Sequence, residues 1–268
     1  MPSMIRIEIY AGLCNRMRVL DSAIQLAKRN NCQIDVIWNL EKKFNCKFDE
    51  LFMMPQSIRK IDYQDLRTLS GKVARTLTHL ISVQFDNRLF HKDINRLRYN
   101  NTKLEELTRG KTTFISTDSD FIKHSQSFKE FVVKEPLAQV ISSYTVDFKH
   151  VVGVHIRRGD HKKATKYSPT TLFIKHMEME LTRQPESRFF LATDSPEVEA
   201  HMVGAFGNRI ITHPKCSRDR NNPDAIKDAL IDLYCLASCK KILGSFWSSF
   251  TNTASKIYGA EATIIKST

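Results

Sequence analysis

The sequence predicts an α/β protein with two Rossmann-type lobes. Three observations support this prediction. The second half of the chain alternates short β-branched runs with helical stripes, which is typical of a parallel sheet covered by helices. The N-terminal residues form their own strand, turn and helix pattern before a second strand. A chain of 268 residues is also too long for one small core and suits two lobes of ordinary size.

The first lobe begins with the alternation of polar and apolar residues in Met4–Ile9, which predicts a strand. Apolar residues at helical spacing then run from Met17 to Ala27 and predict a helix. A turn at residues 11–15 joins these elements, and it leaves the N–H groups at the helix start open to a phosphate or a sugar. A second strand, predicted at 33–38, completes a βαβ unit.

The pattern is weaker in the rest of the first lobe. From 128 to 148, apolar residues follow helical spacing, with Pro136 as a start or a kink. This helix is expected to lead into the second lobe, so we place the boundary between residues 148 and 149, giving lobes of 1–148 and 149–268. The elements predicted before it are a helical turn (48–52), a broken helix (73–92) and a strand (112–117).

A regular alternation of strands and helices makes up the second lobe. Its first strand lies in Val151–Ile156, a β-branched run that we expect to be buried on both faces. Pro169, Pro196 and Pro223 stand where helices begin, because the first turn of a helix needs no proline N–H. The further predicted strands are 188–192, 209–212, 241–243 and 262–265.

The excess of basic residues limits the classes of partner. The chain has 41 Lys and Arg against 29 Asp and Glu, a formal net charge of +12. Such a charge attracts nucleic acid, an anionic membrane surface or a phosphorylated small molecule. None of the common nucleic-acid-binding motifs appears in the basic stretch 59–109, so we expect no nucleic-acid partner. A peripheral membrane contact through the basic surface stays open as an alternative. The sequence does not determine the oligomeric state.

The cysteines and the N-terminus predict a cytoplasmic protein. The six cysteines form no CxxC pair, and most lie in apolar periodic segments, as buried free thiols do in a reducing compartment. Residues 1–10 alternate in polarity and lack the long apolar run of a signal peptide or a membrane anchor.

Polar clusters follow three strands of the second lobe at the points where these strands end. The carboxyl ends of parallel strands meet at one edge, where open α/β sheets bind their ligands. Paired arginines suit a diphosphate, a carboxylate suits the N–H groups of a base, and hydroxyls at a helix start complete a phosphate cradle. The sequence therefore predicts a nucleoside-diphosphate site. Its clusters are His155/Arg157/Arg158/Asp160, Thr193/Asp194/Ser195 and Ser245/Ser248/Ser249.

The residues at 155–160, HIRRGD, resemble the HxRRxD signature of the fucosyltransferases that use GDP-fucose, which the α-1,2-, α-1,6- and protein O-fucosyltransferases share. Three further segments resemble that family in the same order along the chain. They are the glycine-asparagine loop GLCNR at 12–16, the strand end ATD at 192–194 and the serine-rich loop GSFWSSF at 244–250.

This resemblance implies a GT-B-like arrangement of two Rossmann-type lobes with a cleft between them. It also implies an inverting, metal-independent glycosyltransferase that moves fucose from GDP-fucose to a glycan or another hydroxyl acceptor. The lobe 149–268 would bind the donor, and the lobe 1–148 would form the acceptor side. Neither a metal nor a cofactor is expected.

Residue roles follow from the same resemblance. Arg157 would contact the β-phosphate and stabilise the departing GDP. His155 and Asp194 would address the ribose and guanine, and Asn15, beside Gly12, would reach the diphosphate or the acceptor. The implied donor-binding residues are Gly12, Asn15, His155, Arg157, Arg158, Asp194, Ser195, Ser248, Ser249 and Phe250. The implied catalytic residues are Arg157, Asp160 and Asn15.

Two positions depart from the family pattern. Cys14 stands where a glycine is expected, which leaves the acceptor undetermined. The loop 162–165 has no carboxylate where the α-1,6 branch has a glutamate. Either Asp160 serves as the base, or the reaction is loose and carbocation-like and needs little help from a base.

Other interpretations of the same residues stay open. The chain also fits a transferase for another GDP-sugar, or a basic nucleotide- or nucleic-acid-binding protein without transferase activity. His155 also fits a buried core histidine, and Asp194 and the pair Ser248 and Ser249 also fit helix caps. His161 beside Asp160 does not make the compact ligand set that a metal site needs.

Overall fold

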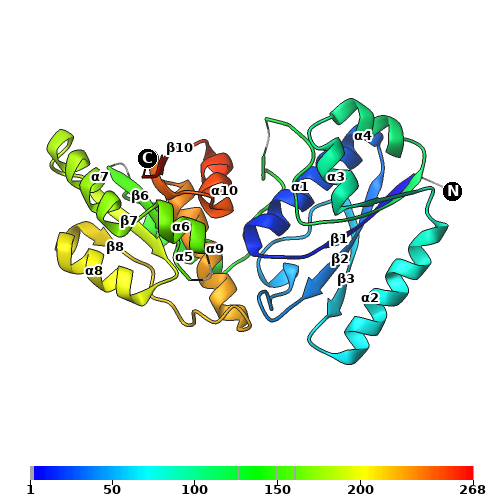
Figure 1. Cartoon of the computed structure of the whole chain (residues 1–268), viewed down its shortest axis with the longest axis horizontal. Helices are drawn as coiled ribbons and strands as arrows, with labels where there is room; N and C mark the ends of the chain where they lie inside the picture. Colours follow the sequence, from blue (N-terminus) through cyan, green and yellow to red (C-terminus); the bar gives the residue numbers. More distant parts are fainter. Residues whose placement is uncertain (1–2, 126, 149, 160, 268) are drawn as a thin grey trace. The chain divides into compact units, whose positions relative to one another are not determined.

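The structure is a computed structural model that describes residues 3–125, 127–148, 150–159 and 161–267. The chain forms two compact units, Met1–Lys134 with Asp219–Ile226 and Glu135–Arg218 with Lys227–Thr268. Each unit contains a five-stranded sheet in which the paired strands are parallel (Figure 1). The predicted α/β class with two Rossmann-type sheets is confirmed. The first boundary between the two units lies between Lys134 and Glu135, so the helix of residues 137–145 belongs to the second unit. The boundary predicted from sequence, between residues 148 and 149, follows that helix.

The sheet of the first unit has the strand order β3-β2-β1-β5-β4. Its strands are β1 (Met4–Ile9), β2 (Gln33–Leu40), β3 (Ile58–Asp65), β4 (Asn87–Phe90) and β5 (Thr112–Thr117). The helices are α1 (Leu13–Asn30), α2 (Leu69–Ile81), α3 (His91–Leu97) and α4 (Asn101–Thr108). β3 and β4 lie at the two edges, and neither carries an apolar run, which explains why their sequences predicted no strand.

The two faces of this sheet differ in polarity. Ile5, Ile7 and Ile9 of β1 are fully buried on one face of the sheet, whereas Glu8 is fully buried on the opposite face, where it pairs with Arg75 and His79 of α2. Burial raises the pKa of Glu8, but hydrogen bonds from Ser116 and Asn39 and the charge of Arg75 lower it overall. The buried carboxylate is therefore ionised and needs polar partners on α2.

Helix α2 consequently packs with its polar side inward. Its Arg75 Nε lies 2.6 Å from a Glu8 carboxylate oxygen, and its His79 Nε2 lies 2.8 Å from the other. The apolar side chains point away from the sheet, with exposed fractions of 78% for Leu69, 51% for Val73, 51% for Leu77, 61% for Leu80 and 53% for Ile81. The helical spacing of apolar residues in this segment thus indicates a helix, but it does not indicate which side of the helix packs against the sheet.

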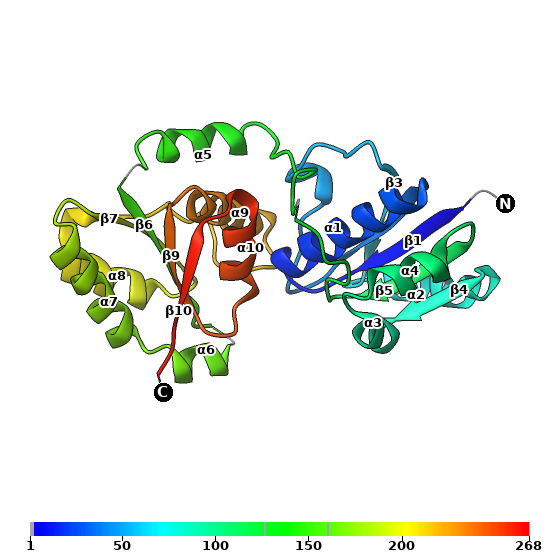
Figure 2. The ribbon, with the colours of Figure 1, turned by 90° about the horizontal axis from the view of Figure 1, so that it is seen from above.

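The sheet of the second unit has the strand order β10-β9-β6-β7-β8. Figure 2 shows β10, β9, β6 and β7 of this sheet. Its strands are β6 (Val151–Ile156), β7 (Arg188–Thr193), β8 (Ile210–Ile211), β9 (Lys241–Ser245) and β10 (Glu261–Ile265). The helices are α5 (Leu137–Thr145), α6 (Lys162–Tyr167), α7 (Thr170–Arg183), α8 (Pro196–Phe206), α9 (Pro223–Ala237) and α10 (Ser249–Tyr258). Every residue of the central strand β6 is buried, as its β-branched run predicts.

All six cysteines lie among the described residues, and none of them forms a disulfide. Within the same described ranges, no helix combines the length and the apolar character needed to cross a bilayer.

Close packing of α10 on β9 depends on Gly244. A Cβ atom at this position would lie 2.2 Å from Cγ2 of Thr251 and 2.5 Å from its Oγ1. Because both distances are far below van der Waals contact, a larger residue here must displace the first turn of α10.

We therefore expect Gly244→Ala to lower the free energy of unfolding by about 1–3 kcal/mol through overpacking. The matched control is Gly204→Ala in α8, where a Cβ atom would meet nothing within 4 Å. This control should raise stability by about 0.5–1 kcal/mol, because glycine is unfavourable inside a helix. Urea unfolding followed by circular dichroism measures both, and equal stability of the two variants would contradict the packing role of Gly244.

Candidate functional site

Three loops of the second unit leave the same edge of its sheet. β6 pairs in parallel with β9 on one side and with β7 on the other, so the carboxyl ends of the three strands are neighbours. The residues that follow these ends are 157–159, 194–195 and 246–248. This is the edge at which ligands bind in open α/β sheets.

The carboxylate of Asp194 organises the loop that follows β6. Its Oδ1 accepts the backbone N–H of Arg158 at 2.7 Å, and its Oδ2 lies 2.5 Å from Nη1 of Arg157. Gly159 adopts a φ of +34°, and a Cβ atom there would come within 2.6 Å of Oδ2. Only glycine therefore lets the loop close around the carboxylate.

Arg157 is tied to β9 through its backbone. Its N–H donates to Oγ of Ser245 at 2.9 Å, and the same hydroxyl donates to the carbonyl of His155 at 3.2 Å. The side chain of Arg157 is 23% exposed and that of Asp194 is 26% exposed, so both reach the surface of the sheet edge. A guanidinium held in this way is oriented before any ligand arrives.

Arg158 points elsewhere and fastens the loop to α7. Its Nη1 donates to the carbonyl of Arg157 at 2.8 Å, and its Nη2 donates to Oγ1 of Thr170 at 2.8 Å. Burial lowers the pKa of Arg158, and the charge of Asp194 partly offsets that effect. The two neighbouring arginines therefore have different surroundings.

His155 is buried and neutral. Its Nδ1 lies 2.9 Å from Oγ1 of Thr251, and its ring stacks on Phe250 with centroids 4.8 Å apart. Burial, followed by the charges of Arg157 and Arg158, lowers the pKa of His155 to about 3. At neutral pH the imidazole is thus a hydrogen-bonding group without charge.

The N-terminus of α10 supplies backbone donors beside this loop. Ser248 is the N-cap residue, and its side chain makes no capping hydrogen bond within the described chain. No acidic side chain lies in the first turn of α10, so the N–H groups and the helix dipole favour an anion. In α8, by contrast, Oγ of Ser195 accepts the N–H of Val198 at 3.2 Å. Ser195, and not Asp194, is therefore the cap of α8.

The structure brings most of the predicted donor-binding residues together at one edge. Gly12 and Asn15 belong to the first unit, where Oδ1 of Asn15 accepts from Arg18 at 3.2 Å. The left-handed residue in the turn before α1 is Ala11, with a φ of 73°, whereas Gly12 has a φ of −77°. Asp160 lies outside the described residues. The members found in the second unit are His155, Arg157, Arg158, Asp194, Ser195, Ser248, Ser249 and Phe250.

Sequence reasoning missed Thr251, which is buried and holds His155. No sequence pattern marks Thr251, because its contacts with His155 and Gly244 depend on the pairing of β6 with β9 and on the packing of α10. Among the residues that the structure describes, no three His, Cys, Asp or Glu side chains are grouped as a metal site.

Comparison with solved structures relates the fold to known enzymes. NodZ α-1,6-fucosyltransferase soaked with GDP-fucose is 19% identical with a TM-score of 0.64, covering 96% of this chain and 93% of that chain. An Arabidopsis thaliana FUT1 variant in complex with GDP is 12% identical with a TM-score of 0.66, covering 98% and 70%. POFUT1 in complex with GDP-fucose is 10% identical with a TM-score of 0.58, covering 98% of each chain.

Sequence comparison finds neither a family model nor a curated protein that matches the chain. The similarity to the solved structures shows that the chain has the two-sheet α/β fold that these fucosyltransferases share. This is the GT-B-type fold expected from the sequence.

The neutral state of His155 makes stability depend on pH in a defined direction. An ordinary histidine has a pKa of 6.5, and His155 has one of about 3, so between these values the unfolded chain binds a proton that the folded chain does not. Stability is therefore lost as the pH falls from about 6.5 toward 3, by up to about 1.4 kcal/mol per unit for this group.

His155→Gln keeps a polar side chain without the titration, so its free energy of unfolding should fall less between pH 7 and pH 4 than that of the unaltered chain. Urea unfolding at several pH values gives both curves. Parallel curves would mean that folding does not lower the pKa of His155, which would contradict its neutral buried state.

Proposed function

We propose that the second unit binds GDP-fucose and that the chain transfers fucose to a glycan or another hydroxyl acceptor. One observation carries this proposal. Arg157 is held by Asp194 and Ser245 at the sheet edge that also presents the N-terminus of α10. Arginine and a helix N-terminus are two groups well suited to a diphosphate. Further support comes from the shared fold, because the compared fucosyltransferases include structures with GDP or GDP-fucose.

The proposed reaction is a single displacement with inversion. The acceptor hydroxyl oxygen forms a bond to C1 of fucose while the bond from C1 to the β-phosphate oxygen breaks, so a β-linked donor gives an α-linked product and GDP. Negative charge grows on the leaving diphosphate, and the Arg157 guanidinium with the α10 N–H groups stabilises it. These groups supply the positive charge that a metal ion supplies in other transferases, so we propose that no metal is needed.

The hydroxyl proton must leave the acceptor during this step. We propose that Asp160 is the base that takes this proton, because Asp160 directly follows Arg157, Arg158 and Gly159 in the chain. The alternative is a loose, carbocation-like transition state, in which the hydroxyl loses its proton late and a base contributes little.

Nucleoside recognition is proposed for neighbouring groups. Asp194 retains lone pairs beyond those that face Arg157 and Arg158, and these can accept from the N–H groups of guanine. Neutral His155 suits the ribose hydroxyls, and Asn15 with Gly12 is proposed to reach the diphosphate or the acceptor. Ser248, Ser249 and Phe250 begin α10 and are proposed to line the phosphates.

A cytoplasmic location is proposed as well. It is supported by the six cysteines, of which Cys14, Cys46, Cys235 and Cys239 are buried and none is in a disulfide.

Substitution of the two arginines should separate catalysis from stability. Arg157→Lys keeps the charge but loses the planar fork, so turnover should fall about a hundredfold or more while the melting temperature changes little. Arg158→Ala removes the bonds to Thr170 and to the Arg157 carbonyl, so it should lower the melting temperature clearly. Steady-state kinetics and thermal unfolding measure both.

Arg183 is the control for both substitutions, because it is exposed on the last turn of α7, away from the sheet edge. Its change to Lys or Ala should leave turnover and melting temperature unaltered. Near-normal turnover of Arg157→Lys would contradict the role given to Arg157.

The function itself is tested by nucleotide selectivity and by activity under chelation. GDP should raise the melting temperature more than GMP, UDP or an oligonucleotide, because only GDP offers both guanine and a diphosphate. Asp194→Ala should weaken GDP binding about tenfold or more, since a hydrogen bond to a charged group contributes ~1.5–3 kcal/mol. Labelled GDP-fucose on a glycan array with EDTA should give fucosylated products.

Stabilisation by the oligonucleotide alone would favour the nucleic-acid-binding alternative. Transfer from another GDP-sugar in preference to GDP-fucose would favour the second transferase alternative. Complete loss of turnover on chelation would contradict the proposed metal independence.

A further inference from the structure

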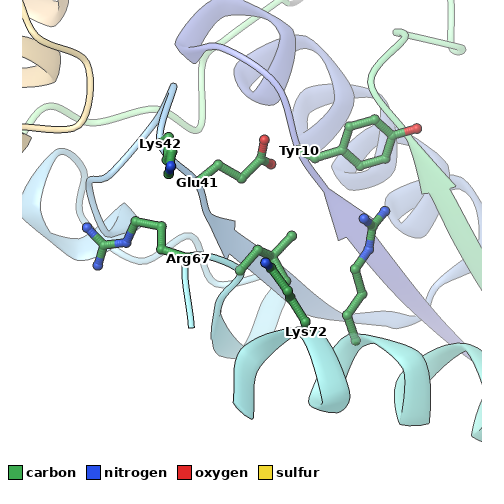
Figure 3. Close-up of a pocket in the computed structure, with 7 residues that line it drawn as sticks. Tyr10, Glu41, Lys42, Arg67 and Lys72 are labelled. Carbon is green, nitrogen blue, oxygen red and sulfur yellow. The ribbon is translucent and has the colours of Figure 1, made fainter. Parts of the chain in front are cut away.

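The first unit has a basic pocket that the predicted site residues do not include. It lies where β1, β2 and β3 end and α2 begins, and its volume is about 570 Å³. Figure 3 shows Glu41, Lys42, Arg67 and Lys72 around this hollow, with Tyr10 at its other side. The lining residues are Tyr10, Glu41, Lys42, Leu66, Arg67, Lys72 and Arg75.

Positive charge in the pocket exceeds what the protein itself neutralises. Arg67 makes two 2.7 Å hydrogen bonds to the carboxylate of Asp65, and Arg75 pairs with Glu8. The side-chain ammonium groups of Lys42 and Lys72 have no ion pair or hydrogen bond to any residue that the structure describes. Two ammonium groups that are not paired with a carboxylate therefore face the pocket, which favours an anionic ligand.

The turn that carries Lys42 is rigidly built. Glu41 and Phe44 exchange two backbone hydrogen bonds of 2.9 Å around it. The fully buried guanidinium of Arg16 donates to the carbonyl of Ala11 at 2.6 Å and to the carboxylate of Glu41 at 3.2 Å. Arg16 thereby joins the end of β1 to the end of β2, next to the pocket.

The start of α2, which carries Lys72, is equally constrained. A Cβ atom on Gly71 would lie 1.9 Å from the carbonyl oxygen of Asp65, so the helix begins in direct contact with the end of β3. Oγ1 of Thr68 caps this helix by accepting the N–H of Gly71 at 3.1 Å. The backbone of Lys72 thus has one defined position at the pocket rim.

Two further groups suit a sugar ring. Tyr10 offers an aromatic ring, with the Arg75 guanidinium 5.8 Å from its centroid. Burial, followed by the charges of Asp118 and Glu8, raises the pKa of Tyr10 to about 12, so its hydroxyl stays a neutral donor. The carboxylate of Glu41 is 29% exposed and can accept from a sugar hydroxyl.

We propose that this pocket binds an acidic saccharide, a sugar that carries a carboxylate, sulfate or phosphate group, through Lys42 and Lys72. The assignment of this saccharide to the acceptor rests on the proposed function, whereas the binding itself does not. An acceptor of this class would make fucosylation depend on the charge of the glycan.

Calorimetric titration of the full chain with glucuronate, galactose 6-sulfate and glucose 6-phosphate tests the binding, with neutral galactose and inorganic phosphate as comparisons. At least one acidic sugar should bind about tenfold or more tightly than galactose, and 0.5 M NaCl should weaken it. The three acidic sugars distinguish carboxylate, sulfate and phosphate as the recognised group.

The double variant Lys42→Gln, Lys72→Gln should weaken the acidic sugar about tenfold or more. The control Lys92→Gln removes an exposed charge from α3, outside the pocket, and should bind as the unaltered chain does. Equal affinity for galactose and the acidic sugars, affinity for inorganic phosphate equal to theirs, or equal losses in the double variant and the control would each overturn the proposal.

GDP binding, measured in the same variants, separates this proposal from the proposed function. The double variant should bind GDP unchanged, since the proposed nucleotide site includes neither Lys42 nor Lys72. A chain that binds acidic sugars but not GDP would contradict the proposed function and leave the pocket proposal standing.

Discussion

The contact between the Asp194 carboxylate and the loop 157–159 is the interaction on which the candidate nucleotide site depends. A carboxylate at the end of β7 receives a backbone N–H and a guanidinium from the end of β6, and Gly159 leaves room for it. Without this carboxylate the guanidinium of Arg157 would lose its charged partner, and the loop would lose one of its fixed points. The arginines of the HIRRGD segment therefore depend on a carboxylate that follows the neighbouring strand β7.

The two units use the same sheet edge in different ways. In the second unit, the fully buried strand β6 leads to the candidate site, which contains one arginine and a helix N-terminus. In the first unit, the buried Glu8 forces α2 to turn its polar side inward, which brings Arg75 to the sheet and sets Lys72 beside the pocket. The fold supplies the common position, and the charged side chains at each edge decide which ligands it suits.

Sequence patterns predicted the parts of this structure in which local and tertiary preferences agree. The apolar run of β6 and the polar clusters that follow β6, β7 and β9 are of this kind. β3 was missed because an edge strand with the sequence IRKIDYQD has no apolar run. The pocket around Lys42 and Lys72 was missed because its residues come from four separate segments, and the partners of Asp194 follow only from strand order.

A crystal structure of the chain with bound GDP tests the central claim most directly. The account predicts diphosphate oxygens within about 3 Å of the Arg157 guanidinium and of N–H groups in the first turn of α10. It also predicts that the contacts of Asp194 with the loop 157–159 persist in the complex. A diphosphate bound away from Arg157, for example between Lys42 and Lys72 in the first unit, would contradict the account.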